Sequence, residues 1–216
     1  MPAPLGLFGG TFDPVHFGHL RLAEEAIGQL TLAGVRWLPA GLPTHRGEPQ
    51  VGPEQRLAMV RLATADNARF MVDAAEVEAA GPSYTVPTLE RLRRQLGERQ
   101  PLVLLLGADA FVGLESWHRW RAVFDLAHIA VSHRPGFPVT AAALPPPLAA
   151  ELAARSADVA ALGAAPAGAI VTFAMTQLAI SATDIRERLA AGRSIRYLLP
   201  DKVLDYIQTH SLYRNA

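Results

Sequence analysis

The sequence predicts an α/β fold, in the form of a Rossmann-like, doubly wound, mainly parallel sheet with helices on both faces. Short apolar runs that suit buried strands alternate along the chain with longer segments whose apolar residues recur at helical spacing. Several of these runs end at glycine or at a Pro-Gly pair, where a strand stops at a turn. With 216 residues, half of them hydrophobic, we expect residues 1–216 to form one domain, with a C-terminal helical segment from about 180 to 216 packed on it.

The strands are predicted from short, mainly apolar runs of three to six residues. The run at 102–106 (LVLLL), which ends at Gly107, has the clearest pattern of a strand buried on both faces. The expected strands are residues 5–8, 35–38, 70–72, 102–106, 128–133 and 170–173. Because ligands bind beyond the carboxyl ends of parallel strands, we expect Gly9, Gly107 and Arg134, which follow three of these runs, to converge on one crevice.

The helices are predicted from apolar residues that recur every three or four positions. The first such series is Leu20, Ala23, Ile27 and Leu30, and later helices are expected at about 54–65, 86–96, 182–191 and 201–209. In the helix at 86–96, the arginines at 91, 93 and 94 are most simply a solvated face. Residues 39–53 form a Pro/Gly-rich loop, and the Ala/Pro-rich residues 137–169 form an excursion with one helix near 147–162.

The charge balance limits the classes of ligand. The chain carries 20 basic and 20 acidic residues, which argues against a broad nucleic-acid-binding face but allows a small anion held by a few cations. It has no cysteine, which excludes disulfides, thiolate zinc sites and cysteine nucleophiles. The longest apolar runs are shorter than the roughly 20 residues that span a bilayer, and no signal peptide is visible. We therefore expect a cytoplasmic protein that contacts neither membrane nor nucleic acid.

Lys202 is the only lysine. A Walker loop needs the lysine of its GK[ST] motif, and ligases that form an adenylyl-lysine need a lysine nucleophile. The sequence around Lys202 fits neither motif. Walker-loop chemistry and adenylyl-lysine chemistry therefore both lack the lysine that they need.

Residues 9–19 (GGTFDPVHFGH) predict a phosphate-binding loop. Gly9 and Gly10 lack Cβ, so their backbone can approach phosphate oxygens, and the helix that follows begins with free N–H groups. His16 and His19 are three residues apart and share one face of its first turn. A plain turn with structural histidines, or a metal site formed with Asp13, are the alternatives. The combination of strand, double glycine and paired histidines favours phosphate.

Residues 180–186 (ISATDIR) predict a second anion site. Ser181 and Asp184 form a variant of the capping box, and Arg186 on its own would be an ordinary surface cation. Capping and binding are compatible, however, because a helix start with hydroxyl groups and an arginine one turn later also attracts anions. Residues 9–19 and residues 180–186 would together hold a phosphate chain from opposite sides. We call these two segments the two jaws of a phosphate clamp.

These two segments resemble the signatures HxGH and ISSTxIR of the (H/T)xGH nucleotidyltransferase superfamily, and within it the bacterial nicotinate-nucleotide adenylyltransferases. Here the first signature is HFGH at 16–19. The resemblance continues, in the expected order, over residues 43–46, 83–85, 107–109, 117–118, 134–136 and 197–200. Two positions depart from the common pattern: Ala182 replaces a serine and Arg46 a lysine, which puts individual phosphate contacts in doubt but not the reaction class.

The resemblance implies a nucleotidyltransferase domain that joins ATP and nicotinate mononucleotide into nicotinate adenine dinucleotide and pyrophosphate, a step of NAD biosynthesis. It implies catalytic roles for His16, His19 and Arg186. The residues implied to bind ATP are Gly9, Gly10, Thr11, Phe12, His16, His19, Gly107, Asp109, Ser181, Thr183 and Arg186. Those implied to bind the mononucleotide are His45, Arg46, Thr85, Asp109, Trp117 and Arg134, with Thr85 at the pyridine carboxylate and Trp117 stacked on the ring.

From the residues alone, each acceptor position has an ordinary structural explanation of equal weight. Trp117 suits the core, Thr85 and Asp109 suit helix caps, and Arg134 before a Pro-Gly turn suits the surface. The sequence leaves the choice between acid and amide mononucleotides open, and also the choice between monomer and homodimer.

Direct in-line transfer is the expected mechanism, because the attacking phosphate is already an anion and needs no strong base. Mg²⁺ would bind mainly through the ATP phosphates, and no protein site for a metal is predicted. The alternatives are a covalent histidyl intermediate, transfer to phosphopantetheine or from a cytidylyl donor, and a nucleotide sensor without catalysis.

Overall fold

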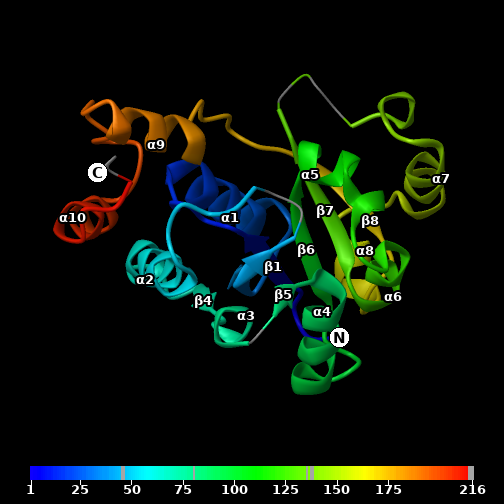
Figure 1. Ribbon diagram of the computed structural model, residues 1–216. Coiled ribbons are helices and arrows are strands. Elements are labelled where there is room, and N and C mark those ends of the chain that lie inside the picture. The colour runs from blue at the N-terminus through cyan, green and yellow to red at the C-terminus, as the bar shows by residue number, and fades with distance from the viewer. Residues whose placement is uncertain (45–46, 80, 135, 137–138, 214–216) are drawn as a thin grey trace. The chain divides into compact units, whose positions relative to one another are not determined.

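The computed structural model describes residues 1–44, 47–79, 81–134, 136 and 139–213 (Figure 1). The chain divides into two compact units. Unit 1 comprises Met1–Gly9, Leu22–Arg36 and Tyr84–Thr176, and unit 2 comprises Gly10–Arg21, Trp37–Ser83 and Gln177–Ala216. The expectation of a single domain over residues 1–216 stays a prediction.

The main sheet has six strands in the order β4-β2-β1-β6-β7-β8. These are β1 (Leu5–Gly10), β2 (Gly34–Pro39), β4 (Phe70–Val72), β6 (Leu102–Gly107), β7 (His128–His133) and β8 (Ile170–Ala174). In unit 1, β6 pairs in parallel with β1 and β7, and β7 pairs in parallel with β8. The predicted α/β fold with a mainly parallel sheet is confirmed, and all six predicted strands are present.

The winding of the sheet reverses between β1 and β6. From β1 the chain runs to β2 and β4 on one side, then returns to β6 and continues to β7 and β8. Ligands of such sheets bind beyond the strand ends at this reversal. Gly9, Gly107 and Arg134 all lie at or directly after the carboxyl ends of adjacent parallel strands of unit 1, as the sequence predicted.

The helices follow the predicted apolar periodicity with a few exceptions. They are α1 (Phe17–Gln29), α2 (Pro53–Thr64), α3 (Ala75–Glu78), α4 (Thr85–Leu96), α5 (Ala108–Val112), α6 (Val123–Leu126), α7 (Pro146–Arg155), α8 (Ala161–Ala164), α9 (Ala182–Ala190) and α10 (Asp201–Thr209). The short helices α3, α5 and α6 were not predicted, because four or five residues are too few to show a helical period. The predicted loop at 39–53 contains β3 (Leu42–Pro43), which pairs with β5 (Pro82–Ser83).

The prediction of one helix near 147–162 is wrong. Helix α7 ends at Arg155, and the chain then forms a bridge between Ser156 and Ile170 before α8 begins. The main-chain N–H of Ala157 donates to the carbonyl of Ile170 at 3.0 Å. This pairing with a strand interrupts the helix, and an alanine-rich sequence gives no sign of it.

The core of unit 1 lies around β6 and β7. Every residue of the LVLLL run is buried, as expected for a strand covered on both faces. Helix α4 contributes Val86, Leu89 and Leu92 to this core, at the spacing of one helix face. Burying each such aliphatic side chain contributes about 1.5–3 kcal/mol.

Arg93 corrects the interpretation of the arginines on α4 as a solvated face. All three of its guanidinium nitrogens donate to main-chain carbonyls, including Nε to Leu126 at 2.8 Å and Nη2 to Pro166 at 2.7 Å. Burial lowers its pKa. The arginine therefore ties the end of α4 to two loops, a role that the surface spacing of three arginines does not reveal.

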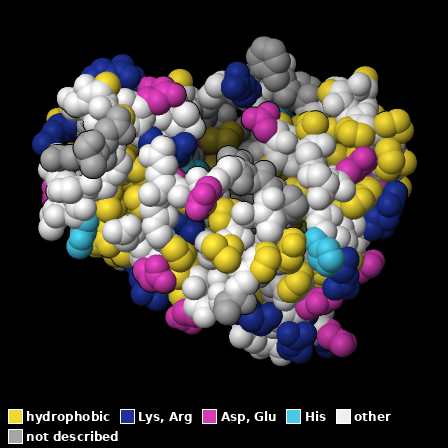
Figure 2. Space-filling model, in the orientation of Figure 1, with side chains coloured by type: hydrophobic (Ala, Val, Ile, Leu, Met, Phe, Trp, Pro, Cys, Tyr) yellow, Lys and Arg dark blue, Asp and Glu magenta, His cyan; other side chains and the backbone are white. Residues whose placement is uncertain are grey.

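Charges of both signs alternate on the face drawn in Figure 2, where Lys and Arg side chains lie among Asp and Glu side chains. This agrees with the balance of 20 basic and 20 acidic residues. Among the described residues, no helix is both long and apolar enough to cross a membrane.

Candidate active site

The loop between β1 and α1 is shaped by its glycines. A Cβ on Gly10 would lie 2.9 Å from the ring of Phe12, which is buried with a left-handed backbone, φ 52°. The Phe12 ring packs on Trp37 at 5.3 Å and edge-on to His19 at 5.1 Å. The phenyl group therefore supports His19, and we expect only the backbone of Phe12 to face a ligand.

His16 and His19 lie on one turn, as the sequence predicted. Their rings stack with centroids 3.7 Å apart, and the main-chain N–H of His16 donates to Nδ1 of His19 at 3.3 Å. In neutral His19 the proton is therefore on Nε2, which is a donor. Burial lowers the pKa of His16 to about 4, so its ring is neutral at pH 7 and avoids repulsion between two stacked cations.

The buried Nδ1 of His16 has no hydrogen-bond partner among the described residues. A Cβ on Gly18 would lie 3.0 Å from this nitrogen, so the glycine of the HFGH segment keeps the space beside it open. Leaving a buried polar atom unpaired costs about 1–3 kcal/mol. The structure thus places an unused hydrogen-bonding group at the start of α1.

The second predicted jaw lies at the start of α9. Ser181 is the N-cap, and its hydroxyl accepts the main-chain N–H of Asp184 at 3.1 Å, which confirms the Ser181 half of the predicted capping box. The Asp184 carboxylate accepts Nε of Arg188 at 2.7 Å instead of completing the box. Nη2 of Arg186 donates to the Thr183 hydroxyl at 3.3 Å. The buried Nε of Arg186 has no partner in the described part of the chain, so this jaw also presents an unused donor.

Asp13 joins the two jaws within unit 2. Its carbonyl accepts Nη1 of Arg186 at 2.7 Å, although the residues are 173 positions apart. Its carboxylate is buried and accepts the Tyr213 hydroxyl at 2.7 Å and the main-chain N–H of Gln50 at 2.9 Å. The sequence suggested Asp13 only as a possible metal ligand, and these bonds occupy its carboxylate with protein donors instead.

Arg56 is a residue of this region that the sequence analysis missed. It is 0% exposed, and its nitrogens donate to the carbonyls of Thr11, Ala40, Gly41 and Val51. Burial lowers its pKa, while the nearby carboxylate of Asp13 opposes this change. Arg56 fixes the back of the glycine loop and adds a positive charge beneath it. Its position on α2, two residues after Glu54, looks like any surface arginine in sequence.

The predicted acceptor residues belong to unit 1. Gly107 is the N-cap of α5, and Asp109 lies exposed in the first turn of that helix. Thr85 is the first residue of α4, after the N-cap position at Tyr84, and its side chain is half-buried. Trp117 is half-buried rather than in the core, and Arg134 is exposed after β7. The rings of Tyr84 and His118 lie 4.9 Å apart on this side.

Two predicted positions, His45 and Arg46, lie outside the described residues, so the structure says nothing of them. Within the described ranges, no group of three or more His, Cys, Asp or Glu side chains is placed to hold a metal ion.

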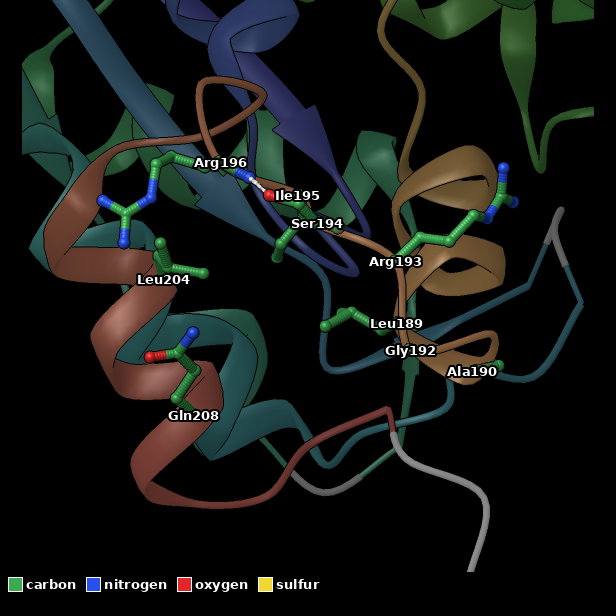
Figure 3. Close-up of a pocket in the computed structure, with 9 residues that line it drawn as sticks. All are labelled: Leu189, Ala190, Gly192, Arg193, Ser194, Ile195, Arg196, Leu204 and Gln208. Carbon is green, nitrogen blue, oxygen red and sulfur yellow. Dashed lines mark hydrogen bonds between the residues drawn. The ribbon is translucent and has the colours of Figure 1, made fainter.

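An open recess of about 560 Å³ lies between the end of α9, the turn at Gly192–Arg196 and α10 (Figure 3). Its lining includes Arg193 and Arg196, and Arg196 is 3.9 Å from Asp201. None of the predicted site residues lines it, and no buried unpaired polar atom of the described chain faces it. The recess therefore lacks the features that mark the two jaws.

Comparisons with known proteins identify the family of this chain. Residues 7–188 match the cytidylyltransferase-like family. The chain is 71% identical, over 100% of both chains, to a protein of Dechloromonas aromatica named "probable nicotinate-nucleotide adenylyltransferase". It is 52% identical to a protein of the same name in Halorhodospira halophila, over 92% of this chain and 90% of that one.

Solved structures show the same fold. The nicotinic acid mononucleotide adenylyltransferase of Plasmodium falciparum, complexed with NaAD, superposes with a TM-score of 0.71 at 14% identity and covers 98% of this chain and 97% of that one. The same enzyme complexed with APC gives a TM-score of 0.68 at 15% identity, over 98% and 97% of the two chains.

Proposed function

This chain belongs to the family of nicotinate-nucleotide adenylyltransferases, and we propose that its two jaws in unit 2 bind the triphosphate of ATP for that reaction. The reaction joins ATP and nicotinate mononucleotide into nicotinate adenine dinucleotide and pyrophosphate. One observation carries the assignment of residues: among the described residues, the buried atoms His16 Nδ1 and Arg186 Nε have no hydrogen-bond partner, and both lie near the starts of helices of the same unit. Helix starts favour anions, and both groups can donate to phosphate oxygens.

The proposed chemistry is an in-line displacement at the α-phosphorus. An oxygen of the mononucleotide phosphate forms the new P–O bond while the bond to the β-phosphate oxygen breaks, and pyrophosphate leaves with the electron pair. His16 and His19 donate to oxygens whose charge grows in the transition state, and Arg186, with the hydroxyls of Ser181 and Thr183, holds the leaving β- and γ-phosphates. The phosphates are lined by the backbone of the first loop, at Gly9, Gly10, Thr11 and Phe12.

Mg²⁺ fits this site as a companion of the nucleotide. The Asp13 carboxylate already accepts two protein hydrogen bonds, so we propose that the ion is held by phosphate oxygens and waters. When bound, it would neutralise charge on the leaving pyrophosphate. Chelation should abolish pyrophosphate release, and added Mg²⁺ should restore it.

For the acceptor we propose the unit 1 residues Thr85, Asp109, Trp117 and Arg134, together with His45 and Arg46. The half-buried Trp117 leaves part of its indole accessible, as a stacking partner requires, and the exposed guanidinium of Arg134 suits a phosphate. Asp109 and Gly107, after β6, would meet ribose hydroxyls.

The test supplies ATP and Mg²⁺ with nicotinate mononucleotide, nicotinamide mononucleotide or phosphopantetheine in separate assays of pyrophosphate release. We expect release with the acid mononucleotide, and less with the amide if the site discriminates through hydrogen-bond donors. Two results would overturn the proposal. One is pyrophosphate release with phosphopantetheine but with neither mononucleotide, and the other is release in the absence of any acceptor.

A labelling experiment tests the direct mechanism. ATP carrying a label in its α-phosphate should leave no label on the protein in the absence of acceptor. A labelled histidine together with ping-pong kinetics would instead support a covalent intermediate.

A further inference from the structure

Tyr213 and Asp13 form a pair of residues that the adenylyl-transfer reaction does not itself require. The Tyr213 hydroxyl donates to Oδ1 of Asp13 at 2.7 Å, and both side chains are buried, with 8% and 6% exposed. Tyr213 reaches this position with a left-handed backbone, φ 61°. Such a conformation costs a non-glycine residue about 1–2 kcal/mol, so the surrounding structure holds it there.

The chain leading to Tyr213 is also fixed. After α10 ends at Thr209, Ser211 is left-handed with φ 51°, and the N–H of Leu212 donates to the carbonyl of Ile207 at 3.0 Å. This is the bond of a Schellman cap, and the side chain of Leu212 is buried. The cap reverses the direction of the chain after α10 and so places Tyr213 next to Asp13.

The geometry between Asp13 and Arg186 is unusual for two opposite charges in contact. Oδ2 of Asp13 lies 3.9 Å from Nη1 of Arg186, whereas a paired carboxylate and guanidinium approach to about 2.7–2.9 Å and bond through two atoms each. The carboxylate is instead turned toward Tyr213 and toward the main-chain N–H of Gln50. Nη1 bonds to the Asp13 carbonyl, and Nε has no partner within the described ranges of the chain.

We propose that Tyr213 is a positioning residue that holds the Asp13 carboxylate away from Arg186, so that the guanidinium stays available to the triphosphate. Among the described residues, this is the only carboxylate within 4.0 Å of the Arg186 guanidinium. Without the tyrosine hydroxyl, Oδ1 loses its donor and the carboxylate can rotate into a two-point pair with Arg186. ATP must then break that pair to bind. This inference rests on the proposed role of Arg186 in binding ATP.

The first variant is Tyr213→Phe, which keeps the ring and removes one oxygen. We expect the Kd for ATP and for a non-hydrolysable ATP analogue, measured by calorimetry, to rise about 5- to 20-fold. The KM for the mononucleotide should stay within about 2-fold. The matched control is Tyr206→Phe, which removes a hydroxyl from α10 and should leave both constants unchanged.

The second variant distinguishes positioning from a structural role. In Tyr213→Phe/Asp13→Asn, the residue at 13 has no charge and cannot form an ion pair with Arg186. We therefore expect the double variant to recover most of the ATP affinity lost in Tyr213→Phe, while Asp13→Asn alone stays within about 3-fold of the parent protein. A purely structural pair would instead make the double variant weaker than either single one.

The outcomes are separable. Parent-like ATP affinity in Tyr213→Phe, or a double variant with no recovery, overturns the inference while leaving the reaction intact. If Tyr213→Phe is too unstable to assay, the comparison of Asp13→Asn with the parent decides, since a loss of ATP affinity above about 10-fold would mean that the carboxylate assists binding. Failure of the parent protein to release pyrophosphate would contradict the proposed function, but the calorimetric ATP measurements would still test this inference.

Discussion

His16 in unit 2 and His128 in unit 1 are both buried, and burial lowers the pKa of both. They differ in their partners. Nε2 of His128 bonds the Ala165 carbonyl at 2.8 Å, and its Nδ1 accepts the N–H of Ala169 at 3.0 Å. In His16, by contrast, Nδ1 has no partner in the part of the chain that the structure describes. A fully paired histidine stabilises the fold, whereas an unpaired one costs stability and is retained where a ligand supplies the partner.

Arg93 and Arg186 show the same contrast. All three guanidinium nitrogens of Arg93 bond to carbonyls, so it ties loops of unit 1 together. Arg186 bonds through Nη1 and Nη2 and leaves Nε without a partner in the described chain. The two arginines are alike in sequence context, as both lie on helices among other charged residues. Their bonding in the folded state separates a structural role from a binding role.

The largest expected effect comes from His16→Ala. We expect kcat/KM to fall about 1,000-fold, equivalent to roughly 4 kcal/mol of transition-state stabilisation, because a donor to the triphosphate is lost. The free energy of unfolding should change little, since the substitution also removes an unpaired buried nitrogen. Initial rates and urea denaturation of the same preparation measure both. Activity within 3-fold of the parent protein would remove His16 from the site.

His128→Ala should behave in the opposite way. It leaves the Ala165 carbonyl and the Ala169 N–H unpaired and opens a cavity, so we expect a loss of about 2–4 kcal/mol in the free energy of unfolding. At a temperature where the variant is folded, its kcat/KM should stay within about 2-fold of the parent value. A selective loss of ATP affinity in this variant would break the distinction between the two histidines.

The pH dependence of stability gives a third comparison. Because the pKa of His16 is about 4 in the folded protein and 6.5 is its ordinary value, the unfolded chain takes up a proton first as the pH falls. The cost is absent above pH 6.5 and grows between pH 6.5 and 4, where it reaches about 3 kcal/mol. In His16→Asn the decline in stability between pH 7 and 4.5 should be smaller by about 2–3 kcal/mol. Equal slopes in the two proteins would contradict the lowered pKa.

The smallest effect is expected at Lys202. It pairs with Asp66 at 2.7 Å, but both side chains are exposed, by 52% and 81%. Such surface pairs contribute less than about 1 kcal/mol. Lys202→Ala should leave kcat/KM unchanged and lower the urea midpoint only slightly, so a large loss of activity would reveal a role for the only lysine that neither the sequence nor the structure assigns.

The features that the sequence predicted correctly have local causes. The continuous run at 102–106, the Ser181 cap and the pairing of His16 with His19 each depend on residues within one element. Spacing and residue type are sufficient for such features, and the alternation of strands with helices was sufficient to predict a mainly parallel sheet.

The features that it missed depend on contacts between distant segments. The hydroxyl of Tyr213 meets Asp13 across 200 positions, and Arg56 bonds carbonyls of a loop 45 positions earlier. No local sequence pattern predicts these partners for a tyrosine near α10 or for an arginine on α2. The acceptor residues Thr85, Asp109, Trp117 and Arg134 stay predictions, as do His45 and Arg46.

The central claim is that the unpaired groups of unit 2 are completed by a triphosphate. The most direct measurement is an NMR titration of the two buried histidines, with and without a non-hydrolysable ATP analogue and Mg²⁺. A phosphate group beside the ring should raise the pKa of His16 well above its value of about 4 in the nucleotide-free protein. The titration of His128 should not change. A His16 pKa that does not respond to the nucleotide, or an equal response of both histidines, would contradict the claim.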